Sequence, residues 1–205
     1  MLQDILSYLD GDFMKLSILI CHIPERAEKL ERLMNVLRPQ LNDDVEVLIE
    51  TDSGEMTIGA KRNLLLEKAI GRYVCFIDDD DLVADYYVSK ILQSITFGYL
   101  MDQVDGTKKM VSPDCIGIKG HYICGERVPA LFIHSLEYDD WQTVNGVHHR
   151  CPNHLNPIKR RIALEVKYPD KSLGEDIAYS RMLRGLLKTQ VMIEDVMYYY
   201  YEGKF

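Results

Sequence analysis

The sequence lacks the features that mark several common classes of protein. It has no basic excess, since 24 Lys and Arg stand against 32 Asp and Glu, a formal net charge of −8. Proteins that wrap a nucleic-acid backbone are usually basic, so nucleic acid stays possible as a partner but is not favoured. No apolar run approaches the roughly 18 residues typical of a membrane-spanning helix, so no transmembrane segment is expected.

Cysteines are few, and their arrangement indicates no disulfide framework. The five form no CxxC pair, and their number is odd. Cys21 and Cys75 lie inside apolar runs, as core thiols do. A reducing compartment is therefore favoured. The first 13 residues, MLQDILSYLDGDF, lack the basic start of a signal peptide, so we expect a cytoplasmic protein.

Strand and helix patterns alternate in the first half of the chain. Short apolar runs predict buried strands over 16–21, 45–49 and 73–77. Apolar residues at helical spacing predict helices over 27–37, 59–70 and 84–95. Gly71 is expected to end the second helix in a left-handed conformation. This alternation predicts an α/β fold with a mostly parallel sheet flanked by helices.

The second half of the chain has shorter elements. Apolar runs at 115–118, 122–124 and 130–133 predict short strands added to the sheet. Asn156 and Pro157 have the pattern of a helix start, with Asn as cap and Pro in the first turn. Gly174 precedes another amphipathic helix, and the tail with its four tyrosines predicts a last strand.

An acidic run, Asp78–Asp81, directly follows the third predicted strand. Residues two apart in an extended chain point the same way, so Asp78 and Asp80 are expected to face one side at the carboxyl edge of the sheet. Clustered carboxylates repel one another unless they are solvated or bind a cation, and Mg²⁺ or Mn²⁺ prefers such oxygen ligands. Alternatively, the run is the acidic start of a helix near Leu82. That interpretation explains Asp81 better than Asp78.

The order of these motifs resembles the family 2 glycosyltransferases with the GT-A fold. The matching segments are LSILICHIPERAEKL, VLIETDSG, Gly59-Ala60-Lys61-Arg62-Asn63, GRYVCFIDDDDLV and GEDIAYSRML. Each piece alone is a weak signal, but their order and spacing over roughly residues 15–187 are fairly specific. The resemblance implies one domain over 1–205, in which 15–100 bind a nucleotide sugar and 110–205 bind the acceptor.

The resemblance also implies roles for individual residues. It assigns Asp78 and Asp80 to the metal, Asp78 also to the donor, Glu50 or Asp52 to the nucleotide base, Arg62 to the diphosphate and Asp176, with its neighbour Glu175, to catalysis. Asp176 would be the base that takes the proton of the acceptor hydroxyl. The acidic pair has a second interpretation, because carboxylates in a first helical turn also stabilise the helix. His154 and Asn156 are expected near the acceptor or the donor sugar.

The implied activity is inverting transfer of a sugar from a nucleotide sugar, a UDP-sugar in the first instance, with Mn²⁺ or Mg²⁺ as cofactor. The acceptor hydroxyl could belong to a glycan, a protein, a lipid head group or a modified nucleobase. The sequence departs from the family pattern in one respect, since no His follows Asp176 as a further metal ligand. The QxxRW motif of processive synthases is also missing, which favours transfer of one sugar per event.

Other interpretations stay open. His148, His149, Cys151 and His154 could bind zinc, although their spacing matches no closed four-ligand pattern. Trp141, the single tryptophan, could stack on a sugar or anchor packing. The rival functions are a nucleotidyltransferase that makes nucleotide sugars, a metal-dependent phosphatase or nuclease, and a non-catalytic nucleotide-sugar-binding module.

Overall fold

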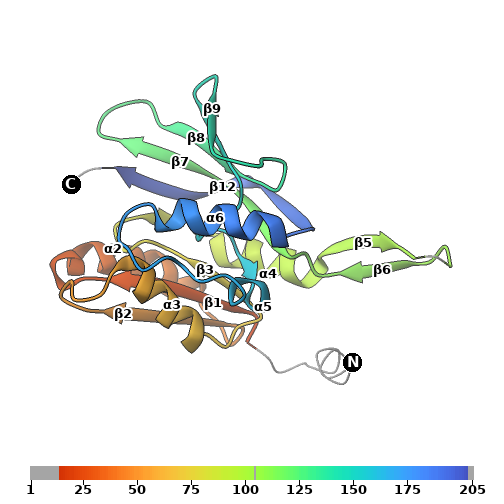
Figure 1. Ribbon diagram of the computed structural model, residues 1–205, viewed down its shortest axis with the longest axis horizontal. Helices are drawn as coiled ribbons and strands as arrows, with labels where there is room; N and C mark the ends of the chain where they lie inside the picture. Colours follow the sequence, from red (N-terminus) through yellow and green to blue (C-terminus); the bar gives the residue numbers. More distant parts are fainter. Residues whose placement is uncertain (1–13, 104, 203–205) are drawn as a thin grey trace.

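The computed structural model describes residues 14–103 and 105–202 (Figure 1). Residues 1–13, where we expect no signal peptide, lie outside this range. Strands from both halves of the chain join in one sheet, in which β2, β1, β3, β11, β7, β8, β10 and β9 are neighbours in that order. β12 pairs with β7 and with the short β4. The first half of the chain therefore forms one side of the sheet and the second half the other.

The first half forms the parallel part of the sheet. Its strands are β1 (Leu16–His22), β2 (Val45–Thr51) and β3 (Tyr73–Phe76), and its helices are α2 (Ala27–Leu37), α3 (Ile58–Lys68) and α4 (Tyr87–Phe97). Both β2 and β3 pair with β1 in parallel. Two single-turn 3-10 helices, η1 (Pro24–Arg26) and η2 (Arg38–Gln40), flank α2. All three strands thus end at the same edge of the sheet.

The second half extends this sheet with mixed pairing. Its strands are β7 (Cys115–Cys124), β8 (Ala130–His134), β9 (Gln142–Val144), β10 (Val147–Arg150), β11 (Ile158–Lys159) and β12 (Gln190–Glu202), to which β4 (Leu82–Val83) adds, and its helices are α5 (Arg160–Ala163) and α6 (Glu175–Leu186). β12 runs parallel to β7 over most of its length. The expected α/β fold class with added short strands is confirmed.

Helices cover both faces of the sheet, so the core has two parts. On one face, α2 and α4 pack Leu33, Leu37, Tyr87 and Ile91 against the strands. On the other face, α3, α5 and α6 pack a second cluster against the same strands. Strands buried on both faces explain why the segments that form β1 and β3 are continuous apolar runs rather than alternating ones.

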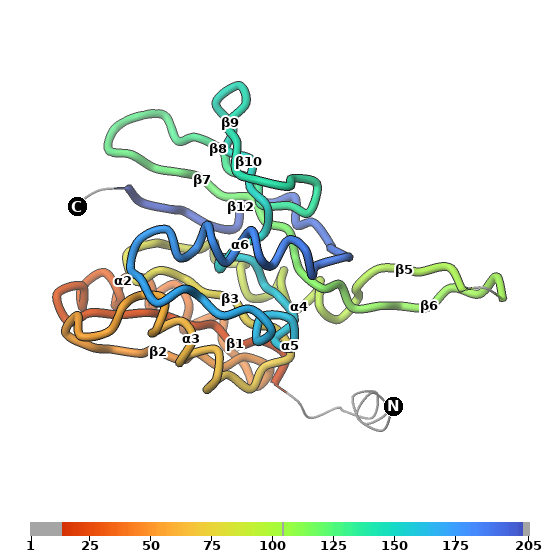
Figure 2. Tube along the Cα trace, viewed as in Figure 1, coloured from red at the N-terminus to blue at the C-terminus, as the bar shows by residue number. Residues whose placement is uncertain are grey.

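One hairpin stands apart from this body. β5 (Tyr99–Asp102) and β6 (Lys108–Val111) form a separate two-stranded antiparallel sheet. The pair projects beyond the end of α4, as the tube trace shows (Figure 2). Most of its side chains are exposed.

Three local predictions were wrong. α4 begins at Tyr87, because Leu82 and Val83 form β4 instead of a first helical turn. Asn156 begins no helix, since it lies in a turn before β11. Gly71 is not in the left-handed region. It is required by close packing instead, because a Cβ atom there would lie 2.6 Å from the backbone nitrogen of Ser17 in β1.

Within residues 14–103 and 105–202, no helix combines the length and the apolar character that crossing a membrane requires.

Candidate active site

A cavity of about 490 Å³ opens at the carboxyl ends of β1 and β3. This volume suits a small-molecule ligand. Residues from both halves of the chain line it: the first half contributes His22, Lys61, Arg62 and Asp78–Asp80, and the second contributes Tyr122, Trp141, Arg150, His154, Glu175, Asp176 and Tyr200. The position agrees with the rule that ligands of open α/β sheets bind beyond the carboxyl ends of the strands.

The acidic run after β3 is a tight turn, closed by a 3.1 Å hydrogen bond from the Asp81 N–H to the Asp78 carbonyl. The turn sends successive carboxylates in different directions. Asp79 is buried and lies 2.8 Å from Nδ1 of His22 and 2.9 Å from Nη1 of Arg26. Asp80 also pairs with Arg26, at 3.2 Å. Asp78, Asp79 and Asp80 all line the cavity, so the run is a turn rather than the extended segment that the spacing of Asp78 and Asp80 assumed.

Asp81 supports the turn from behind and does not line the cavity. Its carboxyl accepts hydrogen bonds from the Tyr198 hydroxyl at 2.7 Å and the Tyr201 N–H at 2.8 Å. Burial, and then the charge of Asp78, raise the pKa of Asp81 to about 8. The Tyr198 hydroxyl in turn accepts from the Asp78 N–H at 3.1 Å. Asp81 therefore fixes the acidic turn to β12.

Asp78 and Asp80 have opposite electrostatic environments. Burial works to raise the pKa of Asp78, but His154 and Arg62 outweigh it and hold that pKa well below its usual range. Burial, and then repulsion by Asp78 and Asp79, raise the pKa of Asp80 against the attraction of Arg26. Asp80 is thus a carboxylate that an added cation would stabilise.

Arg62 connects the acidic turn to α6. Its buried guanidinium donates to Asp78 at 3.1 Å and to Glu175 at 2.9 Å. It also lies 5.5 Å from the ring centroids of Phe76 and Tyr168. We expected Arg62 near a diphosphate. The structure places it in the cavity wall, where it already neutralises two carboxylates.

Glu175 and Asp176 begin α6 but differ in exposure. The preceding Gly174 has φ +72°, a left-handed conformation that favours glycine. Glu175 is 5% exposed and pairs with Arg62. Asp176 is half-buried and lines the cavity, and one of its carboxylate oxygens accepts from the Ile177 N–H at 2.8 Å. Asp176 can therefore reach a ligand more readily than Glu175, whose carboxylate is held by Arg62.

The Gly59–Asn63 segment of α3 positions both sides of the cavity. A Cβ atom at Gly59 would lie 1.9 Å from the Pro169 carbonyl oxygen, so only glycine fits there. The Asn63 side chain donates to the Tyr168 carbonyl and accepts from the Tyr168 N–H, both at 2.9 Å. These contacts hold the loop before α6 against α3. Between them, Lys61 and Arg62 face the cavity.

Neither acidic residue expected to bind a nucleotide base lines the cavity directly. A carboxylate oxygen of Glu50 lies 2.5 Å from Nζ of Lys68 in α3. Asp52 pairs with the buried Nζ of Lys61, and it accepts from the Met56 N–H at 2.6 Å. Base binding by Glu50 or Asp52 therefore stays a prediction. Asp52 does contact Lys61, which lines the cavity.

His154 and Asn156 have different placements. His154 lines the cavity with Nε2 3.5 Å from Asp78 Oδ2, and neither of its buried ring nitrogens has a hydrogen-bond partner. Asn156 is fully buried outside the cavity lining, because its amide donates to the Ile116 carbonyl at 2.9 Å and accepts from the Asn153 N–H at 3.0 Å. Asn156 thus anchors the backbone of this loop, and a contact of its side chain with a ligand stays a prediction.

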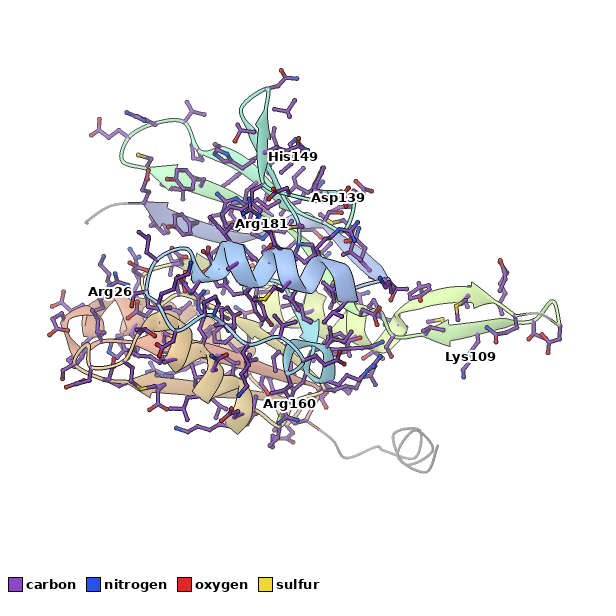
Figure 3. The ribbon with its side chains drawn as sticks, viewed as in Figure 1. Arg26, Lys109, Asp139, His149, Arg160 and Arg181 are labelled. Carbon is purple, nitrogen blue, oxygen red and sulfur yellow. The ribbon has the colours of Figure 1, made fainter. Side chains whose placement is uncertain are left out.

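Three further residues, His22, Arg26 and Arg150, line the cavity without having been predicted as site residues. The end of a predicted parallel strand was a usable signal for His22, and Arg26 follows it closely. No local sequence pattern marks Arg150, because its strand, β10, joins the sheet by pairing with β8. Arg26 lies on the side of the molecule away from the β5–β6 hairpin (Figure 3).

The His148–His154 cluster does not come together as a metal site. Across residues 14–103 and 105–202, no group of three or more His, Cys, Asp or Glu side chains is arranged to hold a metal. His148 contacts Thr143 and Tyr122 instead, and the Cys151 thiol contacts Ser180. Trp141 does line the cavity.

Comparison with known proteins identified structural neighbours only. No family model matches the sequence, and no curated protein matches it. Crystal structures of S. aureus TarS residues 1–349 share its fold: the complex with UDP-GlcNAc at TM-score 0.61 and 14% identity, and the complex with UDP at TM-score 0.62 and 17% identity. The matches cover 93% and 92% of this chain, but only 59% and 60% of the TarS chains. The chain thus spans about three fifths of the structures it matches, and the likeness shows a GT-A-like fold.

Proposed function

We propose that the protein transfers a sugar from a nucleotide sugar, a UDP-sugar, to an acceptor hydroxyl. One observation carries the proposal: Asp78 and Asp80, from the end of β3, share a single cavity with Asp176 at the start of α6. The fold likeness to TarS structures that hold UDP-GlcNAc or UDP supports the choice of donor. The five free thiols fit a reducing compartment, so the cytoplasm is part of the proposal.

The residues at the acidic turn fit a divalent cation. Asp78 and Asp80 offer hard oxygen ligands, and burial, followed by repulsion from Asp78 and Asp79, raises the pKa of Asp80 against the attraction of Arg26. Mg²⁺ is usually bound by one or two carboxylates together with substrate phosphates, so two protein ligands are sufficient. When bound, Mn²⁺ or Mg²⁺ would neutralise the charge of the leaving diphosphate.

Asp176 is the proposed base. It would take the proton of the acceptor hydroxyl as that oxygen attacks the anomeric carbon from the face opposite the diphosphate, which inverts the configuration. Glu175, Arg62 and Asp78 form a continuous chain of ion pairs that fixes the acidic turn relative to α6. Lys61, held by Asp52, is positioned to contact the nucleotide from the first half of the chain.

Thermal unfolding with UDP and Mn²⁺ tests the donor and the metal together. UDP with Mn²⁺ should raise the melting temperature, because a ligand that binds only the native state stabilises it. UDP alone should raise it less, since no cation would then bridge its diphosphate to Asp78 and Asp80. Asp80→Asn should remove the metal-dependent part of the shift. The matched control is Asp195→Asn, an exposed carboxylate that pairs with Lys90 away from the cavity.

Equal stabilisation by UDP with and without Mn²⁺ would contradict a bridging cation. Turnover then separates the rival functions: release of UDP from UDP-sugars with Mn²⁺ supports the transferase. Binding without release would instead identify a non-catalytic binding module.

A further inference from the structure

Four cationic side chains line the cavity, and three of them already have carboxylate partners. Arg26 pairs with Asp79 and Asp80, Lys61 pairs with Asp52, and Arg62 pairs with Asp78 and Glu175. Within residues 14–103 and 105–202, no ion pair joins Arg150 to a carboxylate, and Asp176 is the carboxylate whose charge acts on it most strongly. Arg150 is therefore the one cationic side chain of this lining, among the described residues, without an ion-pair partner.

Arg150 is held by packing rather than by charge. Its guanidinium lies 4.1 Å from the centroid of the Trp141 ring, within range of a cation–π interaction. Burial lowers the pKa of Arg150, while the charge of Asp176 opposes that shift. Arg150 is half-buried, so its guanidinium is partly removed from water without a carboxylate partner, and an anion that enters the cavity would complete the pair. Its face away from Trp141 is thus suited to an external anion.

The surroundings of Arg150 are aromatic. Tyr122 and Tyr200 stack with their ring centroids 5.2 Å apart, and both line the cavity with Trp141 and Arg150. Aromatic faces bury the apolar faces of carbohydrates and polyols, and tyrosine adds hydroxyl groups that hydrogen-bond. The wall therefore combines a cation for an acidic group with a surface for a hydroxyl-bearing carbon skeleton.

We propose that Arg150 binds an acidic group, a phosphate or a carboxylate, on a hydroxyl-bearing acceptor. The proposal rests on the proposed function, whose acceptor class it specifies. Arg150 belongs to the acceptor rather than to the donor because of where it lies. It lines the cavity with Trp141, Tyr122 and Tyr200 from the second half of the chain, the half that also supplies Asp176, the proposed base, and the charge of Asp176 acts on it.

Trp141 is the single tryptophan, so its fluorescence reports on ligands that reach Arg150. The protein, saturated with UDP and Mn²⁺, is titrated with glycerol 3-phosphate and with glucuronate. Glycerol and glucose are the uncharged controls, and inorganic phosphate tests whether the anion alone is enough. The acidic probes should shift the fluorescence at concentrations at least tenfold lower than their uncharged counterparts. Comparison of glycerol 3-phosphate with glucuronate also shows whether the site prefers a phosphate or a carboxylate.

Arg150→Met should weaken binding of the favoured acidic probe at least tenfold and leave the UDP–Mn²⁺ melting shift in place. Arg181→Met is the matched control, because Arg181 pairs with Asp140 next to Trp141 but is exposed and lies outside the cavity lining. Figure 3 labels this residue on α6. It should leave binding of the acidic probe unchanged.

The outcomes separate the two proposals. If UDP gives no melting shift but the acidic probes still bind through Arg150, the donor assignment fails and the anion site stands. If UDP binds and acidic probes bind no better than uncharged ones, the anion site is overturned. Loss of the UDP shift in Arg150→Met would also overturn it, since Arg150 would then serve the donor.

Discussion

At the scale of single residues, the geometry of the cavity wall depends on which cationic side chain pairs with each carboxylate. Arg62 serves two carboxylates with one guanidinium, and it can do so because Asp78 and Glu175 approach it from different elements. Asp176 lines the same cavity but takes no part in the ion pairs of Arg62. Glu175 and Asp176 are neighbours in sequence but have different roles. Glu175 positions Arg62, whereas Asp176 is the proposed catalytic base.

The Asp176→Asn variant should show whether Asp176 acts as a catalytic base or only caps the start of α6. The amide keeps the oxygen that accepts from the Ile177 N–H, so the start of α6 should be preserved. Loss of a general base typically costs about 10²–10⁴-fold in rate, so we expect at least a ~100-fold loss of sugar transfer with unchanged binding of UDP and Mn²⁺. Turnover and the melting shift are the two measurements.

Glu175→Gln is the comparison for that variant. It leaves one of the two carboxylates on Arg62, so it should lower the free energy of unfolding by about 1–3 kcal/mol, the usual cost of weakening a buried charged hydrogen bond. Its transfer rate should fall less than that of Asp176→Asn. A larger loss for Glu175→Gln would assign the base to Glu175.

Asp81 should make stability depend on pH. Its pKa is raised by burial to about 8 in the native state, against 3.8 for an ordinary aspartate. The stability that it contributes is complete below pH 3.8, because both states are then protonated. It is lost as pH rises toward 8, since the unfolded chain ionises first and the native state keeps its proton. Unfolding with urea in EDTA at pH 5 and pH 8 measures this loss.

Asp81→Asn should remove that part of the pH dependence, because its amide is neutral at both values. The variant should therefore gain stability relative to the wild type between pH 5 and pH 8. An identical pH dependence in the two proteins would show that Asp81 is ionised in the native state.

At the scale of elements, α3 joins the two halves of the site. Its first turn is capped by the Thr57 hydroxyl, which accepts from the Ala60 N–H at 3.1 Å. Gly59 and Asn63, four residues apart on one face, contact the loop that precedes α6. The helix therefore determines where Asp176 lies relative to the acidic turn.

Asn63→Ala should loosen this connection. It removes two hydrogen bonds to the Tyr168 backbone, so the free energy of unfolding should fall by about 1–3 kcal/mol. Sugar transfer should fall as well, because Asp176 depends on that loop for its position. Asn35→Ala, at an exposed position of the equally long α2, is the control and should change stability by less than about 0.5 kcal/mol. Equal effects of the two substitutions would contradict the proposed role of α3.

At the scale of the whole molecule, the three-layer body and the β5–β6 hairpin are separable. The hairpin forms its own sheet, and none of its described residues lines the cavity. Its exposed side chains include Leu100, Met101 and Met110. The core and the candidate site therefore do not depend on it.

Replacement of residues 100–110 by a short Gly-Ser linker tests this independence. The shortened protein should fold, keep its melting temperature within about 5 °C and retain the UDP–Mn²⁺ shift. Circular dichroism and thermal unfolding measure both properties. Loss of the folded state would show that the hairpin supports α4, whose last turn leads into it.

The sequence by itself determined the elements that have a local period. Continuous apolar runs predicted β1 and β3, helical spacing predicted α2, and the strand before Asp78 placed the acidic turn at the sheet edge. These features were readable because a strand or a helix repeats over a few residues, so its pattern is complete within one short segment.

Only the tertiary structure decided which side chains meet. Arg62 and Glu175 are 113 residues apart, and Glu50 in β2 pairs with Lys68 in α3. Asn156 has the local pattern of a helix cap, yet its buried amide bonds the backbone of β7. Such partners are set by strand register and by packing between layers, and those contacts leave no period in the sequence that forms them.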